Sequence, residues 1–317
     1  MVSLKGHFWT LMPPLGRAWR RPAAPPGEAW QASLIDPIVG PVQLTGRFHA
    51  PDQARDAVVL VHGLGGCCES PGMRSAAAAA ESAELASLRL NLRGADLRGV
   101  DYYHAGLVAD LEAALASPEL ARFEHVFLLG FSLGGHVALR LACQSPPPRL
   151  AAVAAVCSPL DLHLTQEAID HGVEAALYRV YLLHYLKQIY AGVAARRAVP
   201  TPVERVRTIR TLREWDDLVV TPRFGFADAL DYYERMSVGP VLSRLAVPAL
   251  LIAAMHDPMV PAATLVPWLK QTPARLTVRW VEDGGHMGFP PRIDLGLGLP
   301  GGGTSLESQV LTWLRRA

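Results

Sequence analysis

The chain alternates between short apolar runs and longer stretches with helical spacing. The apolar runs are continuous and end at glycine, proline or charged residues, which is typical of strands buried on both faces of a parallel sheet. These runs are Val58–Val61, Leu88–Leu92, Val126–Leu129, Ala151–Val156, Ala249–Ala253 and Leu276–Val281. The helical stretches between them are Ser75–Ser87, Gly106–Ala116, Gly134–Gln144 and Pro261–Gln271. This order predicts an α/β fold built on a mostly parallel, doubly wound sheet.

The alternation stops over residues 161–239. A long helical pattern there carries Leu177, Val180 and Tyr181, and it predicts a helical cap inserted between two strands. The core then comprises residues 41–160 and 240–317. Residues 1–40 are rich in proline, tryptophan and arginine, and they predict an irregular arm on the surface. The sequence from Thr304 to Glu307 resembles a capping box that opens a last helix.

Charge and composition exclude several classes of protein. The formal net charge of +1 gives no general attraction to nucleic acid. None of the four cysteines has metal-site spacing, so we expect no metal, no cofactor and a reduced, cytoplasmic protein. The N-terminal residues do not form a secretory signal, and the most apolar later stretch, residues 175–190, is interrupted by charges, so no transmembrane segment is expected. Peripheral membrane contact and the oligomeric state stay open.

The first candidate for chemistry is Ser132. It lies in Gly130-Phe131-Ser132-Leu133-Gly134, between a strand pattern and a helix pattern. A serine on such a sharp turn exposes its oxygen, and the residues two before and two after it must lack bulk, which Gly130 and Gly134 do. The motif alone is weak, because a glycine-rich turn with a solvated serine fits it too. Its position between strand and helix makes it much stronger.

Two further residues complete a candidate triad. A serine hydroxyl needs a histidine to take its proton and an acid to orient that histidine. Asp257 follows one predicted strand and His286 follows the next, in the order that this kind of turn requires. Asp257 could instead only start an Asp-Pro turn, and His286 could be an ordinary loop histidine. Asp161 and Asp283 are rival acids.

A glycine-rich turn after Val58–Val61 supplies candidate oxyanion donors. Gly63, Leu64 and Gly65 lie on it, and the amides of Leu64 and Leu133 are the expected donors to a developing alkoxide. A phosphate-binding loop is the competing interpretation, but the Lys-Ser/Thr ending is absent. We expect His62 to brace this turn and the Tyr103-His104 pair to be structural.

The chain resembles the α/β-hydrolase superfamily, and within it the branch of YheT-like hydrolases related to EMB8. The resemblance rests on segments spread in order along the chain: Lys5–Leu11, His62–Gly66, Asn91–Gly94, Tyr103–Gly106, Gly130–Gly135, Cys157–Leu162, Thr221–Phe226, Asp231–Tyr233, Asp257–Pro258 and Gly284–Phe289. It implies an α/β-hydrolase fold with an inserted helical cap and a triad of Ser132, Asp257 and His286.

The resemblance also implies a serine hydrolase that cleaves small carboxylic esters through an acyl-enzyme. The cap aromatics Tyr178, Tyr181, Tyr185 and Phe224 would form an apolar acyl pocket, unless they simply belong to the core. We expect a preference for short to medium acyl chains. Two alternatives remain. One is an acyltransferase that passes the acyl group to an alcohol, and the other is a non-catalytic binding module that keeps the fold.

Overall fold

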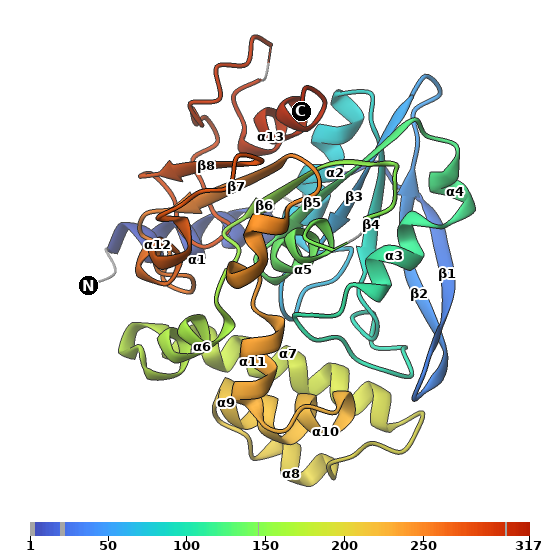
Figure 1. Ribbon diagram of the computed structural model, residues 1–317, viewed down its shortest axis with the longest axis vertical. Coiled ribbons are helices and arrows are strands. Elements are labelled where there is room, and N and C mark those ends of the chain that lie inside the picture. The colour runs from blue at the N-terminus through green and yellow to red at the C-terminus, as the bar shows by residue number, and fades with distance from the viewer. Residues whose placement is uncertain (1–3, 20–22, 145, 302) are drawn as a thin grey trace.

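The computed structural model describes residues 4–19, 23–144, 146–301 and 303–317. Its centre is an eight-stranded sheet with the order β1-β2-β4-β3-β5-β6-β7-β8 (Figure 1). All neighbouring pairs among β3 to β8 are parallel, whereas β2 pairs antiparallel with both of its neighbours, β1 and β4. Their bounds are β1 Glu28–Asp36, β2 Gly40–His49, β3 Asp56–Val61, β4 Ala86–Asn91, β5 His125–Phe131, β6 Leu150–Val156, β7 Ala249–Ala254 and β8 Leu276–Val281. The predicted parallel α/β class is confirmed.

Helices cover both faces of the sheet, which explains the uninterrupted apolar runs of its central strands. One face packs on α2 (Pro71–Ser82) and α13 (Leu306–Leu314). The other packs on α3 (Ala109–Leu115), α4 (Pro118–Ala121), α5 (Leu133–Ala142) and α12 (Ala262–Leu269). The strand β8 differs from the expectation of burial on both faces, because it is an edge strand and Trp280 is 38% exposed.

The segment between β6 and β7 is helical. It contains α6 (Leu162–His171), η1 (Val173–Ala175), α7 (Ala176–Ala194), α8 (Val203–Arg207), α9 (Leu212–Trp215), η2 (Asp216–Val220), α10 (Thr221–Phe224), α11 (Ala229–Met236) and η3 (Gly239–Arg244). Figure 1 shows α7 to α10 gathered at one end of the molecule, beyond the sheet. Tyr178, Leu182 and Leu186 of α7 are buried, while Leu177 and Val180 are exposed. We call α6 to α11 the cap.

The prediction of an irregular arm over residues 1–40 was wrong. The structure has the helix α1 (Leu4–Trp19) and the strand β1 in this region. The prediction rested on the proline-rich composition of this region, because proline lacks the N–H that a helix interior uses. The alternation of Trp30, Ala32 and Leu34 with polar residues fits a half-buried edge strand, and β1 pairs with β2 along its whole length.

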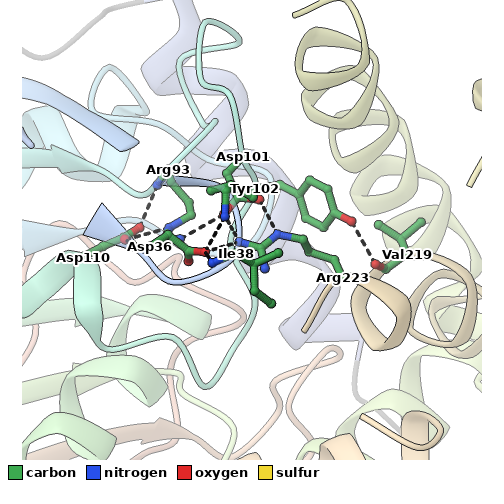
Figure 2. A network of polar contacts seen from close by, with 9 residues as sticks. Asp36, Ile38, Arg93, Asp101, Tyr102, Asp110, Val219 and Arg223 are labelled. Carbon is green, nitrogen blue, oxygen red and sulfur yellow. Dashed lines mark hydrogen bonds and ion pairs between the residues drawn. The ribbon is translucent and has the colours of Figure 1, made fainter. Parts of the chain in front are cut away.

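Five buried charged residues join the core to the cap. Arg93 donates to Asp36, Asp101 and Asp110, and Arg223 of the cap donates to Asp36 and Asp101 (Figure 2). We call these five residues the Arg–Asp cluster. Burial alone would raise the pKa of Asp36, but the amides of Ile38 and Val39 and the Arg93 guanidinium lower that pKa to about 2. Asp36 therefore stays charged at neutral pH, and its ion pair with Arg223 fixes α10 to the sheet.

Candidate active site

Ser132 lies on a strained turn where β5 passes into α5. Its backbone has φ 51° and ψ −123°, a conformation that non-glycine residues rarely adopt. A Cβ on Gly130 would overlap the backbone of Gly134, and a Cβ on Gly134 would overlap the carbonyl oxygens of Val61 and His62. The two glycines are therefore required by close backbone approach. The turn presents the Ser132 hydroxyl at the N-terminus of α5, where partial positive charge favours an anion.

The structure brings Ser132, His286 and Asp257 together in one hydrogen-bonded series. His286 Nε2 lies 3.0 Å from Ser132 Oγ, and His286 Nδ1 lies 2.9 Å from Asp257 Oδ2. Asp257 and His286 are both buried. Asp257 Oδ1 also accepts the N–H groups of Met259 and Val260, so the carboxylate closes the turn at Pro258 as well as contacting the imidazole. Asp257 therefore both forms the Asp-Pro turn and holds the His286 ring.

The rival acids have other partners. Asp161 caps α6 by accepting the N–H of Leu164, and it also accepts the indole N–H of Trp268. Asp283 is exposed and pairs with Lys5 of α1. Neither is in the hydrogen-bonded series of His286.

The glycine-rich turn after β3 lies directly beside Ser132. A Cβ on Gly63 would lie 3.0 Å from Ser132 Cβ, which places the turn within reach of the serine oxygen. In the described part of the chain, the amides of Leu64 and Leu133 have no hydrogen-bond acceptor within the protein. Leu64 and Leu133 both line the pocket that contains Ser132. These two amides can therefore serve a ligand oxygen.

His62 and Tyr103 both hold the glycine-rich turn after β3 in place. His62 Nδ1 lies 2.8 Å from the Gly63 carbonyl oxygen, and its Nε2 accepts the Leu92 N–H at 3.2 Å. Burial lowers the pKa of His62 to about 4, so the ring stays neutral. The Tyr103 hydroxyl accepts the N–H of Gly65 at 2.8 Å. Gly65 is thereby committed to a bond within the protein, unlike its neighbour Leu64.

His104 has a different environment from its neighbour in the sequence. Its ring packs against Phe224, Phe226 and Tyr232 of the cap, and its Nδ1 accepts the N–H of Gly106. Burial and the nearby arginines lower the pKa of His104 to about 3, so the ring stays neutral. Its contacts join core and cap, in agreement with the structural role expected from the sequence.

Ser132 and His286 open onto a cavity of about 540 Å³ between the core and the cap. Apolar side chains of α7, among them Leu182 and Leu186, form much of its wall. Ser132 and His286 lie at its core side, and Asp216 and Tyr233 line it from the cap. The volume falls within the usual range for a site that encloses a small organic ligand.

Cys157 is a neighbour of the three residues that sequence reasoning did not single out. It has φ 51°, it is buried, and its Sγ accepts the Met287 N–H and contacts the Gly285 carbonyl oxygen. Burial, together with the charge of Asp257, raises the pKa of its thiol well above 9. The signal in the sequence was its place at the end of a strand, directly after β6.

Cys157, Asp257 and His286 are also the one group of three potential metal ligands among the described residues. Asp257 and His286 already bind each other, and the Cys157 thiol stays protonated, whereas a metal needs a thiolate. The donor set therefore suits a hydrogen-bonded triad better than a metal ion.

Comparison with known proteins agrees with the fold. Residues 56–292 match the family model described as alpha/beta hydrolase fold. The Escherichia coli protein named "Putative esterase YheT" is 29% identical over 97% of this chain and 89% of its own length. The embryogenesis-associated protein EMB8 of Picea glauca is 26% identical over 63% of this chain and 45% of its own. A monoacylglycerol lipase of Saccharomyces cerevisiae is 24% identical over 75% of this chain and 56% of its own.

Solved structures support the fold. The esterase Pf2001 of Pyrococcus furiosus superposes with a TM-score of 0.56 at 15% identity, over 92% of this chain and 90% of its own. Among the described residues, no helix combines the length and the apolar composition that crossing a bilayer requires. From the family match and its relatives, the chain belongs to the alpha/beta hydrolase fold family, in the branch that contains YheT and EMB8.

Proposed function

We propose that this protein hydrolyses carboxylic esters through an acyl-enzyme formed on Ser132. The observation that carries the proposal is the hydrogen-bonded series from Ser132 Oγ through the His286 ring to Asp257, beside an apolar cavity. A serine hydroxyl becomes a strong nucleophile when an imidazole held by a carboxylate takes its proton. The esterase and lipase names of the relatives support the same class of reaction and a small ester as substrate.

In the proposed mechanism, Ser132 Oγ attacks the acyl carbonyl carbon while its proton passes to His286 Nε2. The amides of Leu64 and Leu133 donate to the resulting oxyanion, and each such donor contributes about 3 kcal/mol in comparable sites. His286 then gives the proton to the leaving alcohol. Water attacks the acyl-enzyme with His286 again as base, which releases the carboxylic acid and restores Ser132.

Asp257 acts on His286 in both steps. It accepts the Nδ1–H, which keeps Nε2 free to take the serine proton, and its charge stabilises the imidazolium that forms. Asp257 is itself fixed by the amides of Met259 and Val260, so it contributes without reorganising.

The wall of the cavity favours acyl chains of short to medium length. Its α7 side chains are apolar, and burying each methylene group contributes about 0.8 kcal/mol. Longer esters should therefore react faster until the cavity of about 540 Å³ is full.

A panel of aryl esters from acetyl to palmitoyl, run on wild type and on Ser132→Ala, tests the proposal. We expect activity that rises to a medium chain and then falls, and its loss in Ser132→Ala. Labelling by a fluorophosphonate should disappear in the same variant. A flat panel at background for both proteins, or labelling that survives Ser132→Ala, would contradict the proposal.

The same assay separates the two alternatives. An acyltransferase would form ester product faster than free acid when an alcohol is supplied, and a non-catalytic module would not react with the fluorophosphonate. The cytoplasmic location stays a prediction from the sequence.

A further inference from the structure

Helix α1 lies against both loops that carry the partners of Ser132. One loop follows β7 and holds Asp257, and the other follows β8 and holds His286. Figure 1 shows α1, in dark blue, beside elements from the other end of the sequence. We infer that the Gly6–Thr10 segment of α1 is a positioning element of the catalytic centre, which holds the Asp257 and His286 loops in register through the Thr10 hydroxyl. This inference rests on the proposed function.

The Thr10 hydroxyl bonds the catalytic loop at the histidine itself. Thr10 Oγ1 accepts the backbone N–H of His286 at 2.8 Å and donates its own proton to the Gly6 carbonyl oxygen at 2.7 Å. The residue is buried. Because its single proton goes to Gly6, the hydroxyl meets His286 as an acceptor, and the orientation of this bond is fixed.

Two glycines allow α1 to approach both loops at backbone distance. A Cβ on Gly6 would overlap the carbonyl oxygen of His256, the residue before Asp257. A Cβ on Gly285, the residue before His286, would overlap the carbonyl oxygen of Gly6. The Gly6 backbone thus lies between the two loops, one residue away from each of the candidate catalytic side chains.

This placement matters because the rate of acyl transfer depends on the position of the imidazole. A displacement of about 1 Å can cost about a hundredfold in rate. Cys157 contacts the Gly285 and Met287 backbone on the same loop, and Thr10 holds the backbone of the residue between them. Thr10 does not reach Ser132 or the oxyanion amides in any contact of the described residues, so it acts through His286.

The same helix also contacts the cap. His7 Nδ1 lies 2.8 Å from the Tyr178 hydroxyl, and the two rings stack with centroids 5.8 Å apart. Tyr178 and Thr10 both line the cavity. Loss of the Thr10 bond should therefore reduce kcat. Tyr178→Phe should act chiefly on KM, since it changes the cavity wall and keeps the bond between Thr10 and the His286 backbone.

The test measures kcat and KM on one aryl ester, together with the rate of fluorophosphonate labelling per folded molecule. Thr10→Val keeps the shape of the side chain and removes the acceptor. We expect kcat to fall about tenfold with KM within about twofold of wild type, and Thr10→Ser to restore most of kcat. The matched control is Thr312→Val in α13, because Thr312 also donates to the carbonyl oxygen four residues before it, and no hydrogen bond among the described residues joins it to either loop.

A second variant tests the packing. Gly6→Ala should lower kcat as Thr10→Val does, although alanine otherwise favours a helix over glycine. Because both changes release the same loop, the double variant should be no slower than the worse single variant.

Several outcomes would overturn the inference. These are Thr10→Val retaining kcat within about twofold, Thr10→Ser falling as far as Thr10→Val, or Thr312→Val falling equally. Failure of both Thr10→Val and Gly6→Ala to fold would make α1 a purely structural helix, which also contradicts it. Failure of the proposed function is distinct, because wild type itself would then show no Ser132-dependent activity or labelling.

Discussion

At the scale of single residues, the Asp257 carboxylate holds both its own loop and the His286 ring. Its Oδ1 accepts two backbone N–H groups, and both of its oxygens lie within 3.1 Å of His286 Nδ1. An asparagine at this position could keep the turn but would present an N–H group to the imidazole. The ring would then be driven to the tautomer that cannot accept the Ser132 proton.

We therefore expect Asp257→Asn to fold normally and to lose about 10⁴-fold in kcat, the loss seen for the equivalent change in serine proteases. The control is Asp161→Asn, because asparagine also caps helices well and Asp161 is bound to α6 and Trp268. Steady-state kinetics on one aryl ester decides between the two acids. A larger loss in Asp161→Asn than in Asp257→Asn would reverse the assignment.

At the scale of elements, the Arg–Asp cluster joins the end of β1, the segment from the end of β4 to α3, and the cap. Asp36 ends β1, Arg93 follows β4, Asp110 lies in α3 and Arg223 lies in α10 of the cap. Three aspartates face two arginines there, and all five residues are buried. Removing one arginine would leave carboxylates without a partner away from water, which costs far more than losing an exposed ion pair.

Arg223→Met should lower the free energy of unfolding by about 3 to 5 kcal/mol. Arg213→Met is the matched control, since Arg213 pairs with Asp217 at 2.9 Å in the neighbouring cap helices with both side chains about one third exposed. That variant should lose no more than about 1 kcal/mol. Urea unfolding of the three proteins measures both values, and equal losses would mean that the cluster has no special role.

At the scale of the whole molecule, the formal net charge is only +1, so general charge repulsion is small. The dependence of stability on pH then comes from individual groups with shifted pKa values. Burial lowers the pKa of His62 to about 4, of His104 to about 3, and also that of His136. Between those values and the ordinary histidine pKa near 6.5, the unfolded chain binds protons that the folded protein does not. Stability from these histidines is thus full above about pH 6.5 and decreases as the pH falls below it.

The ionisation of Asp216 changes stability with pH in the opposite direction from the buried histidines. Withdrawal of its carboxyl from water and the neighbouring Asp170 and Asp217 raise the pKa of Asp216 to about 8, although the Tyr233 hydroxyl bond partly opposes this. Between the ordinary aspartate pKa and 8, the folded protein holds a proton that the unfolded chain has released. Its contribution to stability therefore decreases as the pH rises through that range.

Asp216→Asn removes this titration while leaving an acceptor for Tyr233. The free energy of unfolding of the variant, relative to wild type, should increase between pH 5 and pH 7, by at most about 1.4 kcal/mol per pH unit. Urea unfolding at the two pH values checks this. An unchanged difference between the two proteins would show that Asp216 is ionised in the folded state across the range.

The parts of this molecule that could be predicted from sequence are those with local signals. The six parallel strands could be predicted from their apolar runs. Ser132 directly follows β5, and Asp257 and His286 lie in the loops after β7 and β8. Helix α1 and the Arg–Asp cluster carry no local signal. The prolines of α1 disfavour a helix, so the local sequence did not predict one. The partners of Arg93 lie at positions 36, 101 and 110, and only the folded chain brings them together.

The bond between Thr10 and His286 joins residues 276 positions apart. Contacts this distant along a chain form late, because closing a long loop costs entropy before the contact returns any free energy. During synthesis on the ribosome, α1 emerges early. It can make its contacts only after β7, β8 and the loops that follow them have been synthesised. We therefore expect the nascent chain to acquire the proposed esterase activity only after β8 and the loop that carries His286 have been synthesised.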